Sequence, residues 1–135
     1  MTKYILLFLT FTISSLSSYG QEDKTPMQTV ARIFNQYVEQ GATTDSKTNK
    51  EKMTTALTEL QKTSTRTNLP MLINVWMYYD PTDFPTRKLM EPLFTKDKSA
   101  ALGAIKNRLK NKKSSEDRSK APYSDLLAFH ERLSE

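Results

Sequence analysis

The chain of 135 residues contains no cysteine. It therefore forms no disulfide, and a fold of this size must be held together by packing alone, which favours regular helices over a loop-rich scaffold. A lipid anchor attached through cysteine is excluded for the same reason. The chain also lacks an Asn-x-Ser/Thr triplet, so we expect no N-linked glycan.

Glycine and histidine are almost as scarce. Three glycines and few alternating β-branched residues argue against a sheet-rich fold. The single histidine, His130, would leave a zinc site to be completed by carboxylates alone. No Gly-x-Ser-x-Gly turn is present either. We therefore expect no metal and no cofactor, and we interpret His130 as a half-buried helix residue.

The N-terminal twenty residues have the pattern of a secretory signal. Lys3 provides a positive start, residues 4–13 are apolar, and residues 14–20 are mostly small. The apolar run is well short of the ~20 residues that span a bilayer as a helix. We therefore predict a cleaved leader over residues 1–20, followed by a single domain over residues 21–135. The predicted location is periplasmic or secreted.

The remaining chain shows helical periodicity, with apolar residues at steps of three and four. A first helix is predicted from Pro26, with Thr25 as its N-cap and Gly41 after its C-terminus. The residues predicted to share its buried face are Met27, Val30, Ala31, Phe34, Tyr37 and Val38.

Two further helices follow a polar loop, which we expect to be mobile near residues 41–48. The first should bury Met53, Ala56, Leu57 and Leu60. The second, residues 69–79 capped by Asn68, is apolar nearly all round, which is typical of a central helix. A buried strand is the alternative for so short an apolar run.

Three more helices are expected before the C-terminus. One begins at Asp83 or Phe84, and Pro92 should kink or end it. The next is capped by Asp97, and the last begins at Pro122 or Tyr123. Between these two, residues 110–121 are charged and serine-rich, which predicts a mobile connection. The fold class is thus all-α, a small bundle of five or six short helices.

One turn resembles a known family. Asp80-Pro81 followed by Arg87 is similar to the Asp-Pro…Arg turn of HEAT-type helical repeats. The resemblance covers this turn only, and no array of such turns is present. It implies HEAT-like helical hairpins as an alternative arrangement of the same helices, and we transfer no functional residue from it.

Two groups of residues are candidates for recognition. The first is an aromatic segment, and exposed rings would mark a partner site. Its members are Trp76, Tyr78, Tyr79 and Phe84. The second is a basic run that could meet phosphate groups, anionic lipid or an acidic partner. Its members are Lys106, Arg108, Lys110, Lys112 and Lys113.

These candidates predict a non-catalytic protein- or envelope-binding module that is monomeric or weakly associating. The net charge of +5 is mild, and no aromatic residue interleaves the cations, so we expect no nucleic-acid partner. Two alternatives remain open. Asp80, Asp83 and Glu91 lie near the aromatic segment and could serve a small envelope-acting hydrolase. The basic run over residues 106–113 could instead bind an anionic membrane surface.

The predicted leader is tested by the mass of the exported protein. We expect intact-mass spectrometry of the secreted or periplasmic form to find a chain that begins at Gln21, because small residues precede that position. The prediction would be contradicted if the protein were found in the cytosol as full-length chains that still begin with Met1.

Overall fold

The computed structural model describes residues 24–40, 46–79, 84–113 and 116–135, and within these ranges it is all-helical. The helices are α2 (Pro26–Gln40), α3 (Ser46–Leu60), α4 (Leu69–Tyr78), α5 (Phe84–Thr95), α6 (Lys98–Lys110) and α7 (Tyr123–Ser134), with a 3-10 turn, η2 (Arg66–Asn68), before α4. The prediction of a small helical bundle is confirmed, and the strand alternative for residues 69–79 is wrong. The predicted leader lies outside the described residues.

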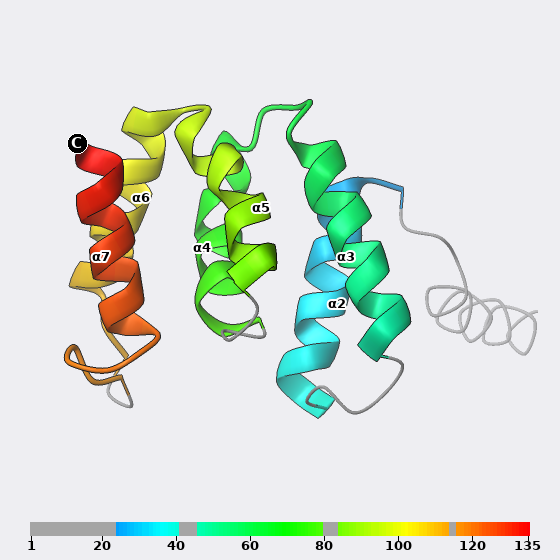
Figure 1. Cartoon of the computed structure of the whole chain (residues 1–135), viewed down its shortest axis with the longest axis horizontal. Coiled ribbons are helices and arrows are strands. Elements are labelled where there is room, and N and C mark those ends of the chain that lie inside the picture. The colour runs from blue at the N-terminus through cyan, green and yellow to red at the C-terminus, as the bar shows by residue number, and fades with distance from the viewer. Residues whose placement is uncertain (1–23, 41–45, 80–83, 114–115) are drawn as a thin grey trace, which may run out of the picture.

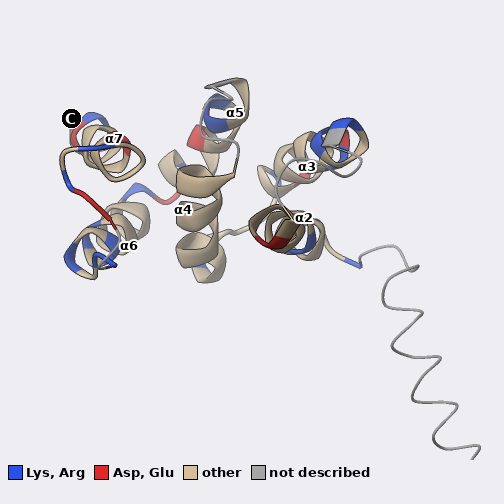
Figure 2. Ribbon diagram, turned by 90° about the horizontal axis from the view of Figure 1, so that it is seen from below, with Lys and Arg blue, Asp and Glu red and all other residues tan. Residues whose placement is uncertain are grey.

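The helices pair in chain order into three hairpins that stand side by side, α2–α3, α4–α5 and α6–α7 (Figure 1). Seen along the perpendicular direction, α2, α4 and α6 form one layer and α3, α5 and α7 form the other (Figure 2). Helix α4 contacts helices of both layers. The α2–α3 and α6–α7 hairpins therefore form the two ends of the row.

Helix α4 is the central helix that its composition predicts. Its buried side chains point to several sides, since they contact α2, α5, α6 and α7. They are Leu69, Leu72, Ile73, Val75, Trp76 and Met77. Pro70 lies in the first turn, where the missing N–H has no intrahelical partner to lose. The helix is thus stabilised chiefly by burial of apolar surface, the dominant favourable contribution to folding.

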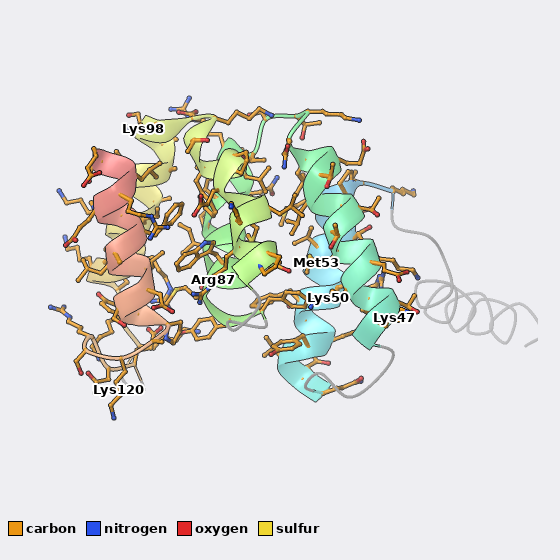
Figure 3. All side chains as sticks on the ribbon, in the orientation of Figure 1. Lys47, Lys50, Met53, Arg87, Lys98 and Lys120 are labelled. Carbon is orange, nitrogen blue, oxygen red and sulfur yellow. The ribbon has the colours of Figure 1, made fainter. Side chains whose placement is uncertain are left out.

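The C-terminal end of α4 is held by Arg87 of α5 (Figure 3). The Arg87 Nε donates to the Trp76 carbonyl at 3.0 Å, and Nη2 donates to the Met77 carbonyl at 3.4 Å. Nη1 pairs with the Asp125 carboxylate of α7 at 2.9 Å. Because terminal helix carbonyls lack intrahelical donors, this buried guanidinium satisfies them and joins three helices. Asp80 and Pro81, which together with Arg87 resemble the HEAT-type turn, lie outside the described residues.

Two of the predicted N-caps are confirmed. Thr25 Oγ accepts a hydrogen bond from the Gln28 N–H at 3.2 Å, and the Gln28 side chain accepts one from the Thr25 N–H at 3.1 Å. This reciprocal pair has the logic of a capping box. Asp97 accepts from the Ala100 N–H at the start of α6. Asn68 makes no such bond, because the 3-10 turn leads directly into α4.

Other details of the prediction are wrong. Val38 is 62% exposed, whereas Ile33 is fully buried, because the face of α2 that packs on the rest of the molecule is centred on Val30, Ile33 and Phe34. Of the two outcomes predicted for Pro92, the end of the helix is wrong, because α5 continues to Thr95, and the kink stays a prediction. In α7, Leu127 is 42% exposed although it lies beside buried Leu126 in sequence.

The central role of α4 predicts a large difference between two identical substitutions. Leu72→Ala, at a fully buried site of α4, should lower the free energy of unfolding by about 2–5 kcal/mol, because it removes apolar contacts and leaves a cavity. Leu127→Ala, at a half-exposed site of α7, should lower it by less than about 1 kcal/mol. Denaturant titration followed by circular dichroism measures both values, and equal losses would contradict the assignment of α4 to the core.

Candidate interaction surface

The aromatic segment is mostly internal. Trp76 is 3% and Tyr79 is 7% exposed. Trp76 stacks on Phe129 with ring centroids 5.1 Å apart, and Tyr79 packs on Tyr37 at 5.0 Å. The expectation that Trp76 and Tyr79 contribute to a contact surface is therefore corrected: α4 is central, so its rings fill the core. The side chain of Phe84 lies outside the described part of the chain.

The basic run divides into two groups. Lys106 and Lys110 are exposed on the same side of α6, one helical turn apart, and Lys113 is exposed just after the helix. Lys112 is half-buried, and its ammonium group donates to the carbonyls of Lys113 and Glu116. Arg108 points inward instead. The structure therefore does not bring the five predicted cations together on one surface.

Arg108 belongs to a half-buried polar cluster, here called the Glu116 cluster, formed by Asn74, Tyr78, Arg108 and Glu116. Arg108 Nη2 pairs with the Glu116 carboxylate at 2.7 Å and donates to the Tyr78 hydroxyl at 3.1 Å. Arg108 Nε donates to Asn74 Oδ1 at 3.3 Å. The Tyr78 hydroxyl donates to Glu116 as well. Two polar side chains of α4 thus contact α6 and the connection that follows it.

The backbone completes the cluster. The Lys113 N–H donates to Glu116 Oε1 at 2.7 Å, and the Glu116 side chain is only 5% exposed. A buried carboxylate is tolerated only when it is paired and hydrogen-bonded, as this one is. The predicted mobility of residues 110–121 stays a prediction, but Glu116 attaches this segment to the body of the protein.

The cluster shifts two pKa values in opposite directions. Burial alone would raise the pKa of Glu116, but the hydrogen bonds from Arg108, Tyr78 and the Lys113 backbone outweigh it and lower this pKa to about 2. Burial and the neighbouring Glu116 carboxylate raise the pKa of Tyr78 to about 12. At neutral pH the carboxylate is therefore charged and the phenol stays protonated, so that it can donate to Glu116.

Positive charge is concentrated in α6 and the connection that follows it. Residues 98–122 contain eight basic and two acidic residues, a net charge of +6. The other 110 residues contain 12 basic and 13 acidic residues, a net charge of −1. The basic ribbon of α6 and its connection lies at one end of the row of helices (Figure 2). The net positive charge of the whole chain is therefore concentrated at this end.

We call this surface the basic end and define it as Lys106, Lys110, Lys112, Lys113, Arg118 and Lys120. Among the described residues, no carboxylate lies within ion-pair distance of these six side chains. Gly103 lies one turn before Lys106 on the exposed side of α6, and a side chain at Gly103 would meet open space. The basic end is therefore open to solvent on the outer side of α6.

The other candidate residues are less suited to catalysis or metal binding. Glu91 pairs with Arg132 at 3.1 Å, while Asp80 and Asp83 lie outside the described residues. His130 is half-buried, as predicted. Within the described ranges, no three His, Asp or Glu side chains are grouped so that they could hold a metal ion.

Sequence reasoning missed the partners that decide where these side chains point. Neither Glu116 nor Asn74 was predicted to be a partner of Arg108. One signal was available: Asn74 and Tyr78 are one turn apart on a helix that is otherwise apolar. Polar groups at such positions require internal partners, and here these come from α6 and its connection.

The Glu116 cluster predicts a pH-dependent contribution to stability. Glu116→Gln should lower the free energy of unfolding at pH 7 by about 1–3 kcal/mol, because it removes the charge that pairs with buried Arg108. Since the pKa of Glu116 is lowered from 4.5 to about 2 on folding, the wild-type advantage should be complete above pH 4.5 and should disappear as the pH falls towards 2. Denaturant titrations at several pH values measure it, with Glu51→Gln on the exposed side of α3 as control. A difference in the free energy of unfolding between wild type and Glu116→Gln that does not change with pH would contradict the pairing of charged Glu116 with Arg108.

Comparisons with known proteins give no family. No protein-family model, curated protein or solved structure matches this chain. No helix in the described part of the chain is long and apolar enough to cross a bilayer. The surface must therefore be interpreted from its own chemistry.

Proposed function

We propose that this protein is an exported, non-catalytic binding module that contacts an anionic component of the cell envelope through the basic end. The observation that supports this most is the distribution of charge. A net charge of +6 lies on 25 consecutive residues, and no carboxylate of the described residues lies within ion-pair distance of the lysines there. Uncompensated charge of one sign attracts a partner of the opposite sign.

The burial of the aromatic rings supports the choice of this surface over the aromatic segment. Trp76 and Tyr79 are needed in the core, and the hydroxyl of half-buried Tyr78 is engaged in the Glu116 cluster. A partner site built on these rings would require the centre of the protein to open. The basic end requires no such change.

The hydrolase alternative receives less support. Catalysis by two carboxylates requires both groups to be free to reach the substrate. Glu91, the one candidate acid within the described residues, is held by Arg132 of α7. The predicted leader supports an envelope partner, since it would deliver the protein to a compartment where phosphate-bearing lipids and polymers are abundant.

Retention on isolated cell envelopes tests the proposal. The mature protein should bind envelopes at low salt, and Lys106→Gln/Lys110→Gln/Lys113→Gln should weaken binding by about tenfold or more, since each lysine near an anionic surface contributes about 1 kcal/mol. The matched control is Lys24→Gln/Lys47→Gln/Lys52→Gln, which removes the same charge from exposed sites on α3 and near the start of α2. Equal loss in both triple variants, or no binding by the wild type, would contradict the proposal.

A further inference from the structure

We infer that the partner of the basic end is the phosphate-bearing surface of anionic lipids, and not an acidic protein. This inference rests on the proposed function and narrows it to one class of partner. Three features of the surface carry it: the kind of cation exposed, the shortage of residues that anchor proteins, and the position of the surface at the end of the molecule.

The exposed cations are mainly lysines. Five of the six residues of the basic end are lysines, and Arg108, the one arginine in the run of residues 106–113, is committed to Glu116 and Tyr78. The planar guanidinium of arginine binds one carboxylate through two parallel hydrogen bonds in a fixed geometry. The ammonium group of lysine, at the end of a flexible side chain, acts as a mobile point charge. Mobile point charges suit a fluid surface of many phosphates better than a single oriented carboxylate.

The same surface offers little to a protein partner. Protein interfaces depend on aromatic and arginine anchors and are depleted in lysine at their centres. Near the basic end, Tyr123 is buried and its hydroxyl donates to the Leu109 carbonyl. The large exposed hydrophobic residues of the described chain are Val38 and Leu127, and neither lies on α6 or its connection. Attraction to anionic lipid requires no such anchor, because charge alone supplies it.

The position of α6 allows its outer side to approach a flat membrane surface. The α6–α7 hairpin ends the row of helices, and no described element covers the side of α6 that faces away from α4 and α7 (Figure 2). Lys106 and Lys110 project from that side, and Gly103 adds no side chain that would hold the helix away from a surface. Lys120 lies on the connection at the same end of the molecule, away from Lys47 and Lys50 of α3 (Figure 3).

The Glu116 cluster leaves the net charge of this surface at +6, because it withdraws one cation and one carboxylate together. It withdraws one of the two carboxylates of residues 98–122 into the interior, where Arg108 neutralises it. It also fixes the backbone at Lys113, whose N–H donates to Glu116. Asp117 is the one acidic residue of this segment that stays exposed. The ion pair thus positions the connection, while Lys106, Lys110 and Lys120 stay exposed.

Co-sedimentation with vesicles tests the inference. The probes are vesicles of phosphatidylcholine alone and of phosphatidylcholine with about one-third phosphatidylglycerol. We expect the mature protein to bind only the anionic vesicles at ~0.01 M salt and to be largely released near 0.15 M, where screening shortens the Debye length to ~8 Å.

Lys106→Gln/Lys110→Gln/Lys113→Gln should reduce the partition coefficient by about a hundredfold, roughly fivefold per lysine. The matched variant Lys24→Gln/Lys47→Gln/Lys52→Gln should reduce it by less than about fivefold, and circular dichroism verifies that both variants are folded.

Other outcomes separate failure of the inference from failure of the proposed function. If anionic vesicles do not bind but isolated envelopes retain the protein through Lys106, Lys110 and Lys113, and protease treatment of the envelopes abolishes retention, the partner is an acidic protein and the lipid inference is overturned. If inorganic phosphate releases the protein from vesicles far better than chloride of equal ionic strength, a discrete phosphate site replaces the lipid surface. If neither vesicles nor envelopes bind, both proposals fall.

Discussion

Burial of α4 between its neighbours is the constraint on which the rest of the structure depends. The helix is too apolar to face solvent on any side, so helices of both layers must cover it. Its few polar groups then require partners from distant segments. Arg87 satisfies the terminal carbonyls, and Arg108 and Glu116 satisfy Asn74 and Tyr78. These contacts attach α5 and the α6–α7 hairpin to α4, so the apolar helix organises the polar contacts as well as the core.

Much of the fold could be predicted because periodicity reports directly on which helix face is buried. The caps at Thr25 and Asp97 and the central position of α4 follow from local chemistry. The exposure of Val38 could not be predicted, because an apolar residue at the margin of a face is buried or exposed according to where its neighbour packs. The continuation of α5 past Pro92 has a related reason, since packing can hold a helix together past a residue that disfavours it.

The candidate surface was less predictable than the fold. A run of cations in sequence does not specify which side chains turn inward, and Arg108 left the surface because Glu116, eight residues later, returns to pair with it. The aromatic residues posed the opposite problem: a ring such as Trp76 suits either a core or a partner site, and only the position of α4 decides between them. What remains exposed is a lysine-rich end on a chain whose other residues are nearly neutral. This separation of charge connects the buried core to the proposed role at an anionic surface.

Hydrogen–deuterium exchange of the mature protein, free and bound to anionic vesicles, tests the account most directly. In the free protein, the amides of α4 should exchange most slowly, because the core is built around this helix. On binding, added protection should be confined to α6 and the connection through Lys120. Rapid exchange of α4 in the free protein, or protection that appears on the α2–α3 hairpin instead, would contradict the account.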